Sequence, residues 1–361
     1  MPMLKNTLLI IQAIKTDKGW DLISVPEMYG FIARLIFMGF VLLLRQEYYW
    51  SSASLHNGNW ARRMISSRDR FRAIMAFFRC NDHTAMDNDD KLRQVRYLID
   101  NVKQSCQDYF QCNKEVAVDE RMVRSKHRSG MRQYNKDKPT KWGLKLWVLA
   151  DSDTGYTYNF NVYLGKTRRR TSGKGLGYDV VMDLTECLRQ QGYHVYTDNF
   201  YTFPPLLKDL KQEGLLGCGT TSANRKHFPK EMKTSGTWAK KVNRGKQRWQ
   251  RFDGDVLRIQ WKDNKVVSML STIHSVWCRR RCKDPRTGRF SIKVLKQPKA
   301  IQDYNRNMKG VDQSDQLIRS YSVLRKVKKY WKVLFFHLID VSIVNAFVLW
   351  KEYRSRARNC D

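Results

Sequence analysis

Between residues 115 and 220, the order of secondary-structure signals constrains the fold of this chain more than any other feature. Upstream, apolar residues recur at the three- and four-residue spacing of helices. Downstream of Glu115, short β-rich runs alternate with turn signals. We expect three strands forming a meander, then a helix, a strand, a helix and a strand, at residues 116–119, 145–150, 156–163, 179–191, 194–198, 205–210 and 215–220.

This order of elements predicts an α/β fold with a ribonuclease H-like catalytic core, in which the first and fourth strands are adjacent and parallel. Residues 224–292 interrupt the pattern with 19 Lys and Arg against 5 Asp and Glu, and with strand-like stretches, which indicates a basic β-rich insertion. The expected parts are a helical domain at 1–115 and 321–361, the core at 116–220 and 299–320, and the insertion at 221–298.

The charge of the chain indicates a polyanionic partner. Its 361 residues include 67 Lys and Arg against 34 Asp and Glu, a formal net charge of +33. A surplus of this size favours nucleic acid over the substrates of a generic metabolic enzyme. Membrane-surface binders usually confine their basic residues to one short amphipathic segment, whereas here they run through the chain. The apolar stretch 333–350 contains His337, Asp340 and Asn345, so we interpret it as a buried or interface helix, and expect no membrane partner.

The cysteines do not form a recognisable framework. The chain has eight, scattered along the sequence, and residues 1–20 lack the cleavage-type end of a secretory signal. A reducing compartment is therefore the expectation. Cys278 and Cys282 have the spacing of half a zinc site, but no second pair follows at a suitable distance, so no zinc is expected in this chain.

Three aspartates are placed where a ribonuclease H-like core would carry catalytic groups. Asp119 ends the first expected strand, Asp198 ends the strand after the first core helix, and Asp312 enters a late helix. Adjacent parallel strands would bring Asp119 and Asp198 side by side. Phosphodiester cleavage needs an activated oxygen nucleophile and a stabilised leaving oxyanion, and two Mg²⁺ (or Mn²⁺) ions held by carboxylates provide both.

Each of these residues also has a purely structural interpretation. Aspartate is common in turns and at helix caps, so any one of the three could have that role alone. Asp315, one turn after Asp312, is either a fourth carboxylate for metal or an ion-pair partner of Arg319. Glu120 is not chosen as a ligand, because it should point to the strand face opposite Asp119.

Several segments, collinear over nearly the whole chain, carry a resemblance to a known family. They are YW (49–50), RF (70–71), AVDERMV (117–123), YNKDKPTKWGLK (134–145), DTGY (153–156), VYLGK (162–166), TDNFY (197–201), YN (304–305), KGVDQSDQ (309–316), KYWK (329–332) and NAF (345–347). In these segments the chain resembles the piggyBac family of DDE/D-type transposases and their domesticated, transposable element-derived relatives.

The resemblance implies that Asp119, Asp198 and Asp312 form a catalytic, metal-binding triad, supported by Asp315. It also implies a helical dimerisation and DNA-binding domain built from both chain ends, a homodimer, and action in the nucleus. Family members excise DNA through hairpin ends and insert it at TTAA sites. They usually end in a cysteine-rich, zinc-binding module that reads the transposon ends, and here Cys360 is the one cysteine where that module would begin.

Basic residues in three regions are candidates for phosphate contacts, which give affinity but no sequence specificity. They are Lys138, Lys141, Lys145, Arg168, Arg169, Arg170, Arg225 and Lys226. Two functions remain open from the sequence. One is an active transposase that cleaves DNA and transfers strands, and the other is a domesticated, non-catalytic DNA- or chromatin-binding protein.

Overall fold

The computed structural model describes most of the chain. Several features named from the sequence lie outside the described residues: the first of the upstream apolar repeats with helical spacing, at residues 4–14, the arginine run 168–170, Lys226, Cys278 and Cys360. The described residues are 23–53, 65, 67–80, 89–128, 130–165, 172–222, 225, 228, 232–233, 237–252, 254–275, 279–283 and 290–358.

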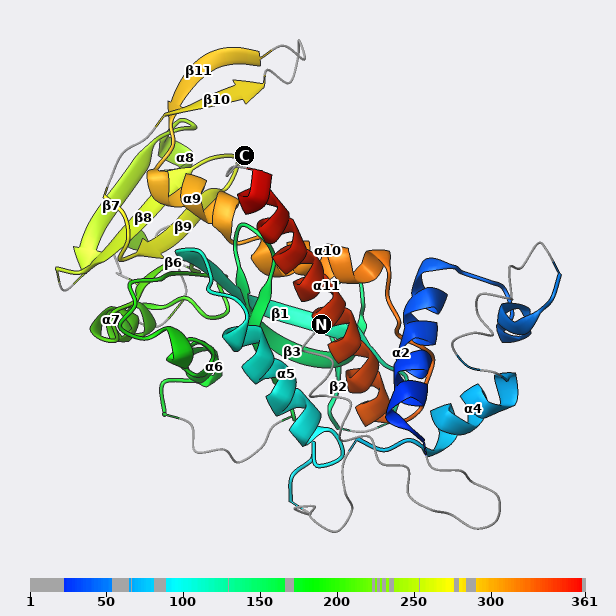
Figure 1. Ribbon diagram of the computed structural model, residues 1–361. Coiled ribbons are helices and arrows are strands. Elements are labelled where there is room, and N and C mark those ends of the chain that lie inside the picture. The colour runs from blue at the N-terminus through cyan, green and yellow to red at the C-terminus, as the bar shows by residue number, and fades with distance from the viewer. Residues whose placement is uncertain are drawn as a thin grey trace.

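A nine-stranded mixed sheet forms the centre of the described structure (Figure 1). Its strands follow the order β2-β3-β1-β5-β6-β9-β8-β7, and β4 also pairs with β3. The strands are β1 (Glu115–Arg124), β2 (Arg132–Tyr134), β3 (Trp142–Asp151), β4 (Thr157–Val162), β5 (His194–Thr197), β6 (Leu216–Thr220), β7 (Gln247–Phe252), β8 (Val256–Lys262) and β9 (Val266–Ser271).

The core half of this sheet has the predicted ribonuclease H-like topology. Strand β1 pairs antiparallel with β3 and parallel with β5, which in turn is parallel to β6. The expectation that the first and fourth core strands are adjacent and parallel is therefore confirmed. Val116 and Val195 pair in this ladder and both are fully buried, as is typical of strands covered on both faces.

Strand β1 is longer than the sequence signals predicted. We expected it to end at Asp119, but it continues to Arg124 because its second half pairs with β3, from Glu120 opposite Trp147 to Arg124 opposite Gly143. Asp119 consequently lies within the strand and not at its end. Strand β2, which was not predicted, adds a short edge beside β3.

The helices α6 (Leu176–Leu184) and α7 (Pro204–Gln212) follow β4 and β5, as expected. The start of α6 differs from the prediction. We expected Asp179 to be the helix cap, but the cap position is Gly175, whose φ of 108° suits glycine, and Asp179 lies inside the first turn. A short 3₁₀ turn, η4 (Glu186–Leu188), ends this helical segment.

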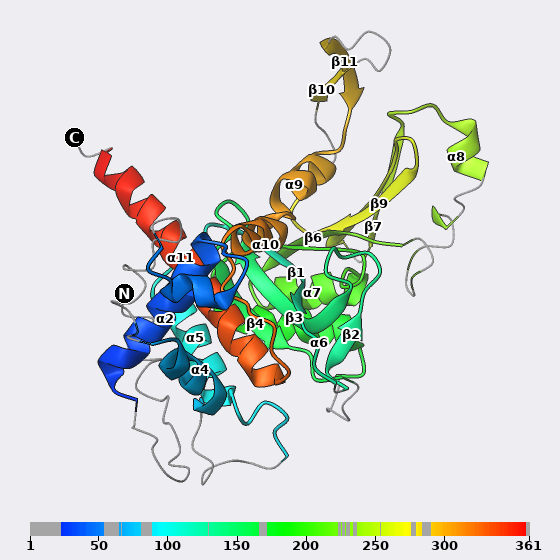
Figure 2. The same ribbon diagram turned by 90° about the vertical axis from the view of Figure 1, so that its right-hand side faces the viewer.

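Helices cover both faces of the core sheet (Figure 2). A Cβ added at Gly217 on β6 would lie 2.4 Å from Leu207, so α7 packs closely on that face. The next residue, Cys218, faces the other way and its thiol contacts the Ala300 carbonyl oxygen of α9 (Lys299–Asn307). Helix α10 (Gly310–Ser320) follows α9 and packs against β1 and β3.

The insertion continues the central sheet instead of forming a separate one. Strand β9 pairs antiparallel with β6, and β8 and β7 extend the sheet from there. A short helix, α8 (Thr237–Lys241), precedes β7. Strands β10 (Arg279–Lys283) and β11 (Phe290–Lys296) form a separate two-stranded sheet beyond this edge (Figure 1). The β-rich character predicted for this region is confirmed.

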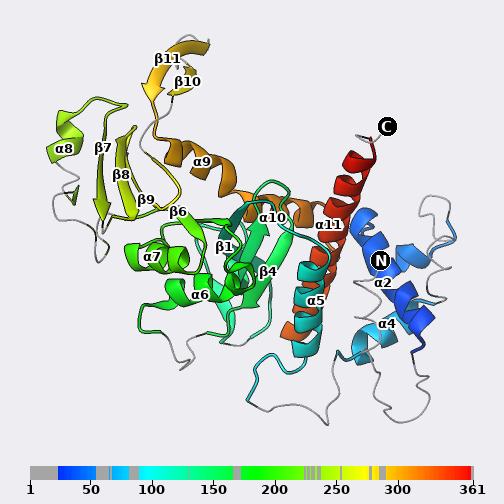
Figure 3. The same cartoon turned by 60° about the vertical axis from the view of Figure 1, so that its left-hand side comes forward.

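Segments from both chain ends share one hydrophobic core (Figure 3). Phe78 contacts the rings of Phe31, Trp331 and Phe335. The elements that contribute to this core from the two ends are α2 (Val25–Phe40), η1 (Gln46–Trp50), α4 (Arg68–Phe77), α5 (Arg96–Asp108) and α11 (Tyr330–Arg358). Among the described residues, α11 is the one helix long and apolar enough to cross a membrane. However, 72% of its apolar window is buried inside the protein, in agreement with the buried helix predicted at 333–350.

Candidate catalytic carboxylate site

Asp119 and Asp198 occupy adjacent positions of two parallel strands. Val118 of β1 pairs with Thr197 of β5, and each aspartate is the next residue along its strand. Asp119 remains in the β1 ladder, whereas Asp198 begins the loop after β5, where its Oδ1 accepts a hydrogen bond from the Phe200 backbone N–H at 2.9 Å. The parallel register therefore brings together two carboxylates that are far apart in the sequence.

Burial raises the pKa of both groups. It raises the pKa of Asp119 to about 6, because the loss of solvation outweighs the nearby Lys138 ammonium, and the Asp198 carboxylate raises it further. Burial also raises the pKa of Asp198, and the Glu120 carboxylate adds to that effect. Carboxylates gathered out of water repel one another, which favours a cation between them.

Lys138 links Asp119 to the third candidate carboxylate. Its Nζ lies 3.0 Å from Asp119 Oδ2. Burial opposes the charged form of Lys138, but the carboxylates of Asp119 and then Asp312 overcome this and raise its pKa. Asp312, in the first turn of α10, therefore lies within electrostatic range of the ammonium that contacts Asp119.

Helix α10 is held on the sheet by a close approach and a buried ion pair. A Cβ at Gly310 would lie 2.7 Å from the Asp151 carbonyl oxygen, so this approach requires glycine. Arg121 of β1 donates from Nε to Asp315 Oδ1 at 2.5 Å and from Nη2 to Ser314 Oγ at 2.8 Å. These contacts fix the helix that carries Asp312.

The environment of Asp315 bears on the two roles that the sequence left open. Its carboxylate pairs mainly with Arg121, and the predicted partner Arg319 is more distant, at 3.8 Å. Arg121 and Asp315 are 194 positions apart in the chain, so no sequence signal identified this pair. The ion-pair role therefore has direct geometric support, and the carboxylate is already occupied.

The donor chemistry fits a hard divalent cation. Asp119, Asp198 and Asp312 supply carboxylate oxygens, which are the ligands that Mg²⁺ and Mn²⁺ prefer. Within the described part of the chain, no group of three or more His, Cys, Asp or Glu side chains is already gathered at metal-ligand distance. Lys138 contacts Asp119 instead, so metal binding would require this ammonium to share or release the carboxylate.

Glu120, which was not chosen as a ligand, is part of the local electrostatics of the site. Its carboxylate accepts a hydrogen bond from Asn135 Nδ2 at 2.5 Å and forms an ion pair with the Lys145 ammonium. Its charge also raises the pKa of Asp198. Glu120 is therefore paired with side chains of its own region.

The candidate DNA-contact residues differ in how available they are. Lys138 and Lys145 are ion-paired to Asp119 and Glu120, whereas Lys141 is exposed. Arg225 donates to the backbone carbonyl oxygens of Asn199 and Phe200, directly after Asp198. Of the four members of the group that the structure describes, Lys141 is thus the one best placed for a simple phosphate contact.

Tyr201 is a residue of the site that sequence reasoning did not select. It is 1% exposed, and among the described residues its hydroxyl has no hydrogen-bond partner. Burial raises its pKa, and the carboxylates of Asp119, Glu120 and Asp198 add to this. The one sequence feature that could have identified Tyr201 as part of the site was its position three residues after Asp198.

This sheet topology is that of the ribonuclease H-like class of folds. Comparison with known proteins identifies the family within that class. A family model described as Transposase IS4 matches residues 3–347, and the chain therefore belongs to this transposase family.

The relatives of the chain are piggyBac proteins, as the sequence motifs indicated. It is 28% identical over 352 residues to the human PiggyBac transposable element-derived protein 3, covering 93% of this chain and 57% of that protein. It is 23% identical over 338 residues to the human PiggyBac transposable element-derived protein 2, covering 91% and 55%. The chain thus spans little more than half the length of these relatives.

A solved structure supports the fold. The cryo-EM structure of the piggyBac transposase synaptic complex with hairpin DNA matches with a TM-score of 0.77 at 24% identity, over 95% of this chain and 69% of that one. The resemblance to piggyBac transposases and their derivatives is therefore confirmed.

Proposed function

We propose that this chain is the catalytic body of a piggyBac-like DNA transposase that performs metal-dependent phosphodiester cleavage and strand transfer. The observation that carries the proposal is that two half-buried carboxylates, those of Asp119 and Asp198, and the exposed carboxylate of Asp312 lie near one lysine in a chain with a net charge of +33. Asp119 and Asp198 are neighbours across β1 and β5, and Asp312 acts on the same lysine as Asp119. Carboxylates this near to one another repel, and a bound cation would relieve that repulsion.

Asp119, Asp198 and Asp312 would hold two divalent ions, Mg²⁺ or Mn²⁺. When bound, such ions lower the pKa of an attacking oxygen and stabilise the leaving oxyanion. The chain's own residues prepare the site. With a pKa of about 6, Asp119 is ionised at neutral pH, and Lys138 balances its charge. Asp315 holds α10 through Arg121 and is left out of the proposed ligand set.

The proposed partner is DNA, in the form of transposon ends and a TTAA target. The basic composition supports this, and the structural relative is a piggyBac transposase in a synaptic complex with hairpin DNA. A homodimer acting in the nucleus follows from the family relationship and is part of the same proposal.

A plasmid cleavage assay tests this function. Supercoiled plasmid carrying the flanks of this gene's own genomic copy is incubated with the protein and Mg²⁺ or Mn²⁺. We expect cleavage at the TTAA junction, and a loss of at least about a hundredfold in Asp198→Asn, because a metal ligand contributes several kcal/mol to transition-state stabilisation. Asp69→Asn is the matched control, because Asp69 is 81% exposed on α4. Equal cleavage by wild type and Asp198→Asn would refute the proposal.

One observation favours a second candidate function. Lys138 already neutralises Asp119, and the described carboxylates are not gathered for a metal. This arrangement suits a domesticated DNA- or chromatin-binding protein without catalysis. That function predicts DNA binding that weakens steeply with salt, no cleavage with either metal, and equal affinity in Asp198→Asn.

A further inference from the structure

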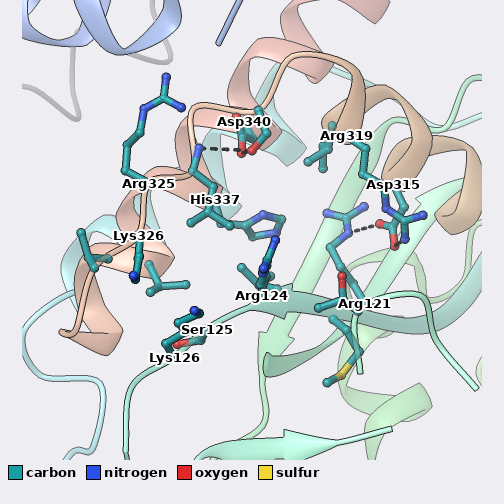
Figure 4. A pocket seen from close by; sticks show the side chains of 18 residues that line it. Arg121, Arg124, Ser125, Lys126, Asp315, Arg319, Arg325, Lys326, His337 and Asp340 are labelled. Carbon is teal, nitrogen blue, oxygen red and sulfur yellow. Dashed lines mark hydrogen bonds and ion pairs between the residues drawn. The ribbon is translucent and has the colours of Figure 1, made fainter. Parts of the chain in front are cut away.

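A cavity of about 470 Å³ lies beside the carboxylate site, between the second half of β1, the end of α10 and the start of α11 (Figure 4). Its lining includes neither Asp119, Asp198 nor Asp312. We call it the basic cavity and define it by Arg121, Arg124, Lys126, Lys326 and His337. Its size lies in the usual range for small-molecule sites.

The charges around the basic cavity are unbalanced. Six Lys and Arg side chains line it, against two carboxylates, those of Asp315 and Asp340. Both carboxylates are used by the fold. Asp315 pairs with Arg121, and Asp340 accepts hydrogen bonds from the Val323 backbone N–H at 2.7 Å and the Ser322 hydroxyl at 2.8 Å. The positive surplus therefore remains available to an anion.

Two buried side chains in the lining have unused nitrogen atoms. Arg121 is 2% exposed and His337 is 3% exposed. Among the described residues, Arg121 Nη1 and His337 Nε2 have no hydrogen-bond partner. In Figure 4 these side chains approach one another from β1 and α11. Because an unpaired buried polar group is costly, these atoms indicate a ligand or an ordered water at the floor of the basic cavity.

The rim of the basic cavity differs from its floor. Arg124, Lys126 and Lys326 are exposed and come from two separate segments, the end of β1 and the connection before α11. Burial, with a further effect of Arg121, lowers the pKa of His337 well below its usual value, so the imidazole is neutral. An incoming anion would meet exposed cations first and buried, desolvated donors last.

We propose that the basic cavity binds a phosphate monoester or free phosphate, inserted end-on. Guanidinium groups match phosphate oxygens in geometry and charge. A terminal phosphate has three unesterified oxygens and one attachment, so it can reach the recessed floor. A backbone diester continues on both sides and would be restricted to the rim. The site is independent of the proposed cleavage, because it contains none of the three candidate metal ligands.

Calorimetric titration with chelator present, so that divalent metals play no part, tests this proposal at constant ionic strength. The probes are inorganic phosphate, a short DNA strand with a 5′-phosphate, and the same strand with a 5′-hydroxyl. We expect phosphate to bind, and the 5′-phosphorylated strand to bind about tenfold or more tightly than its 5′-hydroxyl form. The ratio of affinities for inorganic phosphate and the phosphorylated strand identifies the source of the phosphate.

Variants assign the binding to the basic cavity. Arg124→Met/Lys326→Met and His337→Leu should each weaken phosphate binding about tenfold or more, whereas His337→Gln, which keeps a donor, should retain more of it. Arg356→Met is the control, because Arg356 is exposed at the far end of α11. Circular dichroism checks that each variant is folded. If His337→Leu is not, the phosphate affinity of the Arg124→Met/Lys326→Met variant decides whether the basic cavity is the binding site.

Three results would overturn the proposal. They are an absence of phosphate binding beyond that of chloride, unchanged binding in the surface double variant, and equal affinity for the two strands. Equal affinity for the two strands would show that the Lys and Arg side chains of the basic cavity contact backbone phosphates and not a terminal phosphate.

Discussion

Asp119 and Asp315 are two carboxylates of similar burial, with 15% and 11% of their side chains exposed, and each has a cationic partner. Their partners differ in kind. Lys138 makes one contact with Asp119, whereas Arg121 joins Asp315 to Ser314 and Thr157 through several hydrogen bonds. Lysine is a flexible point charge and arginine a planar fork. Burial alone therefore does not distinguish Asp119, a proposed metal ligand, from Asp315, a carboxylate paired within the fold, but the geometry of the cationic partner does.

The largest expected effect concerns the structural pair. Arg121→Met leaves the Asp315 carboxylate buried without its main partner, and we expect a loss of about 3–5 kcal/mol in the free energy of unfolding. Chemical denaturation measures it. Arg319→Met is the matched control, since Arg319 is 51% exposed and lies 3.8 Å from the same carboxylate, and it should cost less than about 1 kcal/mol. Equal effects of the two variants would remove the proposed distinction between Asp119 and Asp315.

Metal binding would distinguish the proposed ligands, which include Asp119, from the structural carboxylate Asp315. A divalent ion that binds only the folded protein stabilises it by about 2.7 kcal/mol at a hundred times its dissociation constant. We expect Mn²⁺ to raise the unfolding temperature of the wild type, and this rise to disappear in Asp198→Asn. Asp315→Asn should lower the starting stability but keep the metal-induced rise. Loss of the rise in Asp315→Asn would instead make Asp315 a ligand.

The protonation of Asp119 gives a pH-dependent effect. Its pKa is raised to about 6 in the folded state, so the folded protein holds this proton more tightly than the unfolded chain. The stability that this group contributes is therefore lost as the pH rises through the window from about 4 to 6. Asp119→Asn removes the titration, and its stability relative to the metal-free wild type should rise across this window by about 1–3 kcal/mol.

Urea unfolding at pH values below and above this window measures the difference. The loss of the Lys138 ion pair in the same variant offsets part of the gain, so the change with pH is the diagnostic quantity. Parallel stability profiles for the two proteins would show that Asp119 has an ordinary pKa.

The smallest expected effect separates exposed from paired lysines. Lys141→Met should weaken DNA binding severalfold and reduce the slope of log affinity against log salt by about 1, because one phosphate contact is lost. Lys145→Met should change the slope less, because its ammonium is paired with Glu120. Fluorescence anisotropy over a range of salt concentrations measures both slopes. A larger effect of Lys145→Met would show that this pair opens on DNA.

Much of the fold was predictable, because strand and helix periodicities are local. The order of core elements and the parallel pairing of β1 with β5 were predicted correctly. The end of β1 at Asp119 and the helix cap at Asp179 were wrong. Pairing with β3 extends β1 through charged residues that weaken its strand signal, and Gly175 begins α6 with a backbone conformation that the sequence pattern did not specify.

The site was predictable only in part. The adjacency of Asp119 and Asp198 follows from strand order, and their assignment with Asp312 as metal ligands stays a prediction. The partners of these groups were not predicted. Arg121, which holds Asp315, gave no signal in the sequence because it acts on a distant element, and the one signal for Tyr201 was its position three residues after Asp198.

The sequence by itself determined the order of the core elements, the excess of positive charge and the family of the chain. Only the tertiary structure decided which cation each carboxylate meets. Lys138 reaches Asp119 across 19 positions, from the connection between β2 and β3 to β1, and Arg121 of β1 reaches Asp315 of α10 across 194. Periodicity fixes the face on which a side chain lies, but the packing of distant elements fixes what it faces.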